Sequence, residues 1–151
     1  MGYYMKTNIV GKFRDDVTHE QFWKVISPVI DGYEIEGNYD ESTRCVNLTA
    51  YGQASGGYYD ELSEVAKELG KLSAEVGWIS LYNYDDPNLE DAISDFYFGP
   101  SEEAIQKYKS VSAVSHALSM IRGHVPAETF EAVRGLLAQA IPGIAGDAQP
   151  E

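Results

Sequence analysis

Residues 18–51 read THEQFWKVISPVIDGYEIEGNYDESTRCVNLTAY and combine a helix signal with a hairpin signal. Thr18 and Gln21 have the spacing of a capping box, in which each side chain binds the other residue's backbone N–H at the start of a helix. Pro28 removes one helical hydrogen bond, so we expect the helix to end or kink near it. The predicted helix buries one face, made of Phe22, Val25, Ile26, Val29 and Ile30.

The second half of this segment predicts two antiparallel strands. Residues 33–36 alternate aromatic or aliphatic side chains with glutamates, which is the period of a strand with one face in water. Residues 40–42, Asp-Glu-Ser, supply turn chemistry. Residues 43–51 form the return strand, with Cys45, Asn47 and Thr49 on one face and Val46, Leu48 and Ala50 on the other.

The remaining elements follow from the same periodicities. Strand patterns cover residues 3–13, 78–84 and 92–98, and helical patterns cover residues 62–72, 101–121 and 130–141. This order predicts an α+β fold, a ferredoxin-like split βαβ sheet with an extra strand and a helical C-terminal extension. A different strand order is the alternative. We expect a single α+β domain over residues 1–142 and a flexible tail over residues 143–151.

Composition narrows the classes of function. The 151 residues include 24 Asp and Glu against 11 Lys and Arg, and the formal net charge is −13. A surface with this much negative charge repels phosphate backbones and anionic lipid. We therefore expect no direct binding to nucleic acid or membrane. The single cysteine, Cys45, excludes an intramolecular disulfide and fits a reducing cytoplasm. We therefore expect a cytoplasmic protein.

Common catalytic and metal motifs are absent from the sequence. His19, His116 and His124 lack the spacing of paired metal ligands. The run of oxygen-bearing side chains from Asp85 to Asp91 does not follow the order of an EF-hand, which leaves a calcium site and a charged strand connection as alternatives. We expect no catalytic residue, no metal site and no cofactor.

Charge placement is the most informative feature. Residues 73–105 contain eight acidic residues and no Lys or Arg, and tyrosines are interleaved with the acids. Like charges confined in this way cost stability, and tyrosine is enriched at binding hot spots. The sequence therefore predicts a partner-binding surface made of Asp85, Asp86, Glu90, Asp91 and Asp95, with Tyr82, Tyr84 and Tyr97 as anchors and Glu34, Glu36 and Tyr39 as second choices.

The opening residues Gly2, Tyr3 and Tyr4, the small size and the acidity together resemble small accessory proteins of bacteriophages and their actinobacterial relatives. Some proteins of that kind inhibit host defence nucleases, and several act as DNA mimics. The resemblance implies a stoichiometric inhibitor, located in the host cytoplasm if phage-encoded. It transfers no functional residue to this chain.

These features predict a non-enzymatic acidic protein that occludes a basic nucleic-acid-binding surface of a partner protein. Carboxylates then occupy the Lys and Arg sites that otherwise hold phosphates, and association is fast and sensitive to salt. Two alternatives stay open. One is a small ligand-binding or enzymatic domain with a pocket lined by Trp78, Tyr82 and Asp95. The other is a homo-oligomeric structural protein that pairs through residues 92–98 or its C-terminal helices.

Overall fold

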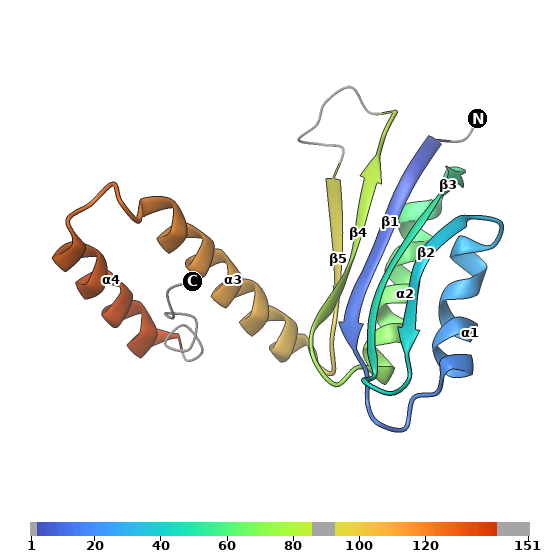
Figure 1. Cartoon of the computed structure of the whole chain (residues 1–151), viewed down its shortest axis with the longest axis horizontal. Helices are drawn as coiled ribbons and strands as arrows, with labels where there is room; N and C mark the ends of the chain where they lie inside the picture. The colour runs from blue at the N-terminus through green and yellow to red at the C-terminus, as the bar shows by residue number, and fades with distance from the viewer. Residues whose placement is uncertain (1–2, 86–92, 142–151) are drawn as a thin grey trace. The chain divides into compact units, whose positions relative to one another are not determined.

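The computed structural model describes residues 3–85 and 93–141 (Figure 1). Its strands form one antiparallel sheet of order β2-β3-β1-β4-β5. The strands are β1 (Tyr3–Lys12), β2 (Glu34–Asp40), β3 (Cys45–Ala54), β4 (Gly77–Asn83) and β5 (Ile93–Phe98). The helices are α1 (His19–Ile30), α2 (Tyr58–Leu72), α3 (Glu102–Ile121) and α4 (Ala127–Ala140). The predicted α+β class is confirmed.

The contacts within the chain divide it into two compact units, Met1–Ile105 and Gln106–Glu151. The first unit contains the sheet with α1 and α2, and the second contains most of α3 and all of α4. The single domain expected over residues 1–142 stays a prediction, and the expected tail over residues 143–151 lies outside the described residues. Within the described part of the chain, no helix is both long and apolar enough to cross a membrane.

Helix α1 begins with the predicted capping box. The backbone N–H of Gln21 donates to Thr18 Oγ1 at 3.2 Å, and the backbone N–H of Thr18 donates to Gln21 Oε1 at 2.8 Å. Pro28 lies in the last turn, and the helix ends soon after it at Ile30, as the missing N–H of proline favours. The apolar face of α1 is buried at Phe22, Ile26, Val29 and Ile30.

Alternation along the strands places one face of the sheet in the core. In β1, Met5, Thr7 and Ile9 are buried, whereas Lys6 and Asn8 between them are half-buried. Helices α1 and α2 lie on the buried side of the sheet (Figure 1). The opposite side, which α1 and α2 do not cover, is called the outer face below.

One polar pair lies inside this core. Tyr58, the first residue of α2, is 3% exposed, and its hydroxyl oxygen lies 2.9 Å from Thr7 Oγ1. Burial raises the pKa of the Tyr58 hydroxyl, because a phenolate would lose its hydration there. The pair therefore joins the start of α2 to the central strand β1.

The second unit has a small core of its own. Leu118 of α3 and Phe130 of α4 are buried against each other's helix, and the Arg122 guanidinium lies 5.1 Å from the centre of the Phe130 ring. At the start of α3, Ser101 Oγ accepts a hydrogen bond from the backbone N–H of Ala104 at 3.1 Å, as a serine N-cap does.

Replacing Tyr58 with Phe removes the hydroxyl and leaves Thr7 Oγ1 buried without this partner. We expect the free energy of unfolding at neutral pH to fall by about 1–2 kcal/mol, measured by urea denaturation. Tyr59→Phe is the matched control, because Tyr59 is 41% exposed and adjacent on the same helix. It should change the unfolding free energy by less than about 0.5 kcal/mol, and a loss as large as that of Tyr58→Phe would contradict the expectation.

The same variant tests the pH dependence of stability. The pKa of Tyr58 is raised above its ordinary value of 10.0 in the folded state, so its contribution is complete below that pH and is lost as the pH rises above it. From about pH 9 to about pH 11, the wild type should therefore lose more unfolding free energy than Tyr58→Phe. Equal losses in both proteins would count against a buried, neutral Tyr58.

Candidate functional site

Alternate side chains of five strands meet on the outer face. The strand register aligns one row across the whole sheet, made of Glu36, Thr49, Asn8, Ser80 and Asp95. Directly opposed residues of neighbouring strands lie on the same face. The row therefore ends in an acid at each edge of the sheet, and four strand spacings separate the two acids by about 19 Å.

Hydrogen bonds hold the middle of this row in place. Asn8 Nδ2 lies 3.1 Å from each of three acceptors, Thr49 Oγ1, Asn47 Oδ1 and the carbonyl oxygen of Leu48. Ser80 Oγ donates to Asp95 Oδ1 at 2.7 Å. The polar atoms at the centre of the outer face are thus fixed by neighbouring strands.

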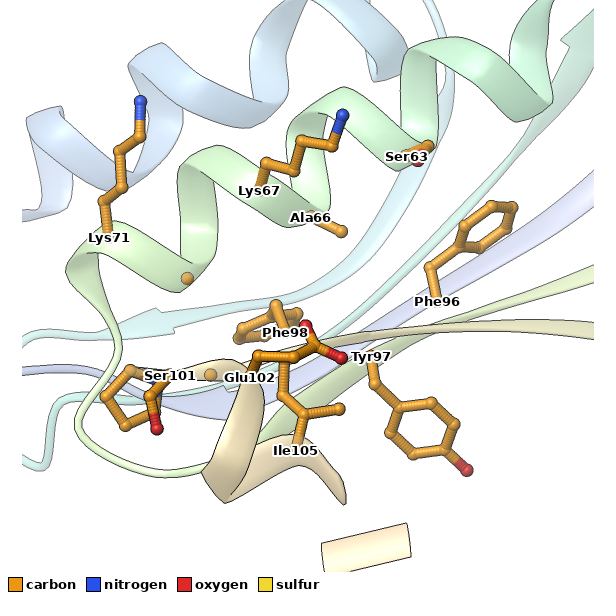
Figure 2. Close-up of a pocket in the computed structure, with 13 residues that line it drawn as sticks. Ser63, Ala66, Lys67, Lys71, Phe96, Tyr97, Phe98, Ser101, Glu102 and Ile105 are labelled. Atoms are coloured by element: carbon orange, nitrogen blue, oxygen red, sulfur yellow. The ribbon is translucent and has the colours of Figure 1, made fainter. Parts of the chain in front are cut away.

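Tyrosines surround the polar row. The Tyr82 ring lies 4.7 Å from the Tyr84 ring, which lies 5.6 Å from the Tyr4 ring. Tyr84 is 49% exposed and Tyr4 is 42% exposed. Tyr97 lies opposite Trp78 and points away from α2 (Figure 2). These rings form an accessible surface with polar tips, which suits contact with another protein.

A hollow of about 450 Å³ lies at the centre of the outer face. Lys6 lies in it between Tyr51 and Tyr82, its neighbours in the strand register. The full lining is Lys6, Asn8, Asn47, Thr49, Ser80, Leu81 and Tyr82. The lining therefore offers an ammonium group, amides and hydroxyls, and it contains no carboxylate from residues 3–85 or 93–141.

Asp85 lies at the corner of the face where β4 ends. Its Oδ2 accepts a hydrogen bond from the backbone N–H of Tyr4 at 2.7 Å, which joins the end of β4 to the start of β1. The predicted residues Asp86, Glu90 and Asp91 lie outside the described residues. In residues 3–85 and 93–141, no group of three or more His, Cys, Asp or Glu side chains is arranged to hold a metal ion.

The sheet brings most of the described members of the predicted surface together. Strand register places Glu34, Glu36, Tyr82, Asp95 and Tyr97 on the outer face, and ring contact places Tyr84 beside Tyr82. The register explains this gathering, because residues far apart in sequence become neighbours across the strands. That they bind a partner stays a prediction.

Tyr39 is a correction to the predicted surface. It is 2% exposed, its hydroxyl donates to the carbonyl oxygen of Val17 at 2.9 Å, and its ring stacks on Phe22 at 4.9 Å. Tyr39 lies opposite Val46 in the register, so it points into the core. Its even spacing from Ile35 is the sequence signal that places it on the inward side.

The predicted partner-binding surface left out the residues that β1 and β3 contribute to the outer face. Tyr4, Lys6 and Asn8 come from β1, and Thr49 and Tyr51 come from β3. The signal for the β1 residues was available, because they alternate with the apolar and β-branched side chains of residues 5–9.

Known proteins give no further guide to this surface. No protein-family model, no curated protein and no solved structure is significantly similar to the chain. Function therefore has to follow from the chemistry of the outer face.

Replacing Asn8 with Asp removes both N–H donors and sets a carboxylate against three oxygen acceptors. We expect the free energy of unfolding to fall by about 2 kcal/mol, measured by urea denaturation. Asn83→Asp is the control, because Asn83 uses its Oδ1, which an aspartate keeps, to accept a hydrogen bond from the backbone N–H of Asp85 at 2.9 Å. That change should cost less than about 0.5 kcal/mol; similar costs for both variants would mean that the Asn8 bonds do not hold the face.

Proposed function

We propose that this chain is a non-enzymatic binding protein whose outer face docks on a basic nucleic-acid-binding surface of a partner protein. The observation that supports this is the arrangement of acids at both edges of one aromatic sheet face, with Glu34 and Glu36 on β2 and Asp95 on β5. Lys and Arg side chains of a partner would pair with these carboxylates. The exposed tyrosines would supply the contact area between them.

The mechanism is competition with phosphate. Carboxylates of the outer face occupy ammonium and guanidinium groups that otherwise bind phosphate oxygens, and no covalent bond forms or breaks. The net charge of −13 attracts a basic partner from a distance, and salt weakens that attraction. We propose in particular a bacteriophage protein that acts in the cytoplasm of the host cell and inhibits a defence nuclease of that host.

We also propose that β1 to β4 with α1 and α2 form a ferredoxin-like unit, and that β5 is an extra strand beside it. What supports this is the order β2-β3-β1-β4, in which α1 connects β1 to β2 and α2 connects β3 to β4. Both connections skip a strand that lies between their ends, as in a split βαβ unit.

A small-ligand site is the alternative that a specific observation supports. The hollow at the centre of the outer face has a lining that suits a small polar or anionic molecule, with Lys6 as the cation. Trp78 and Asp95, expected to line a pocket, are not among its lining residues. The lining residues that the structure describes include no Asp or Glu, so Lys6 supplies their only charged group.

The test compares two triple variants that change the net charge equally. Glu34→Lys, Glu36→Lys and Asp95→Lys reverse three acids of the outer face. The control set reverses three exposed acids outside that face, Asp31, Glu64 and Glu68, to Lys. We expect the outer-face variant to bind its basic partner at least ~tenfold more weakly, because its own lysines repel the partner, and we expect the control to bind much as the wild type does.

The measurement begins with capture on the tagged wild-type protein and elution by rising salt. A captured nucleic-acid-binding protein is then purified and titrated against the wild type and both variants, with DNA or RNA as a competitor. Equal weakening in both variants would reduce the effect to net charge alone. Unchanged binding in the outer-face variant, or no displacement by nucleic acid, would remove this face as the docking surface.

A further inference from the structure

The two edge strands of the sheet differ in how they are protected. On β2, Glu34 and Glu36 are exposed, and Gly37 has a φ of +86°. Charges and local distortions of this kind discourage pairing with another sheet. Strand β5 reads ISDFYF, with one charged residue and neither Lys nor Pro, and among the described residues it pairs with β4 alone. An aromatic and β-branched edge of this composition favours pairing.

A groove of about 470 Å³ lies between β5 and α2 (Figure 2). Ser63, Ala66 and Gly70 line it from the helix, and Phe96 and Phe98 line it from the strand. The small helix residues keep α2 close to the end of β5, since a Cβ atom on Gly70 would lie 2.9 Å from the carbonyl oxygen of Gly99. A half-buried Phe96 ring therefore faces the groove beside the outer edge of the sheet.

We propose that a second copy of this chain pairs its β5 antiparallel with the first, so that two sheets become one and the two grooves cover each other. Opposed residues of antiparallel strands share a face, so a two-fold axis normal to the sheet passes beside one residue of β5. An axis at Asp95 sets two carboxylates opposite each other, which is destabilising. An axis at Phe96 sets ring against ring and places each Asp95 opposite Tyr97 of the second copy.

Charge on α2 fits the same symmetry. The acids Asp60 and Glu61 lie in its first turn, and Lys67 and Lys71 lie in its second half. A two-fold axis makes the two copies of α2 antiparallel, so the lysine end of each helix approaches the acidic end of the other. The local ion pairs of these lysines, with Glu64 and Glu68 at 2.9 Å, are exposed and of little energetic weight, so they leave the lysines available.

This self-association does not depend on the proposed function. The two-fold axis leaves both outer faces on the same side of the joined sheet, where they would present a doubled acidic and aromatic surface. Failure of the dimer would leave docking by a single outer face intact, and failure of docking would leave the dimer intact.

Sedimentation velocity of the full chain from about 1 to about 100 µM is the first test. We expect the mass to rise from one chain to two, and Phe96→Lys to raise the dissociation constant by ~tenfold or more, because it sets two ammonium groups opposite each other on the axis. Glu36→Lys, on the other edge strand, should leave the dimer unchanged. A wild type that stays monomeric throughout, or a folded Phe96→Lys variant that dimerises as well as the wild type, would overturn the proposal.

Cysteine cross-linking tests the register and avoids a new charge. In a Cys45→Ser background, which removes the native exposed thiol, a cysteine is placed by Phe96→Cys, by Ser94→Cys or by Glu36→Cys. Only position 96 meets itself across the proposed axis, at a separation that a disulfide can span, whereas the two copies of position 94 lie about 14 Å apart. Oxidation should join two chains through Phe96→Cys alone. Equal cross-linking at position 36 or 94 would refute the register.

Discussion

The sheet depends on the burial of alternate side chains in its central strand β1. Met5, Thr7 and Ile9 are each at most 2% exposed between β3 and β4. A slip of one residue would carry Lys6 and Asn8 into the core, where an unpaired ammonium and amide are costly to bury. This register also determines the outer face, because every strand is paired through β1 to the same row of polar and aromatic side chains.

The side chains of the outer face are more ordered than a face that only keeps the protein in solution needs to be. A solvated acidic face needs only dispersed carboxylates, but here the polar atoms at the centre are fixed by Asn8 and Ser80, and the acids lie at the two edges. Between them, Tyr4 and Tyr84 keep nearly half of their surface exposed. Exposed rings in mutual contact give up part of their conformational freedom in advance, so a partner pays less entropy to bind them.

Features that depend on residues close together in the chain could be predicted from the sequence, and features that depend on pairing between distant segments could not. The capping box at Thr18, the turn after Asp40 and the alternation of β3 all depend on neighbours in the chain, and the structure contains them. The strand order depends on pairings between distant segments, which periodicity does not encode. The division into two units was also hidden, because α3 crosses the boundary after Ile105 as one continuous helix and leaves no Gly- or Pro-rich linker at that point.

The net charge and the residues of the two edge strands together limit which edge of the sheet can pair with a second copy of the chain. At −13, two chains repel each other, so contact requires a place where their acids are not opposed. The β2 edge presents Glu34 and Glu36 and fails this condition. Asp95 is the one charged residue of strand β5. A two-fold axis at Phe96, one residue away, keeps the Asp95 carboxylates of the two copies from lying directly opposite each other. Among the described residues, β5 is therefore the edge at which a two-fold axis keeps the strand carboxylates from opposing each other, and it lies beside the groove, where apolar surface is left to bury.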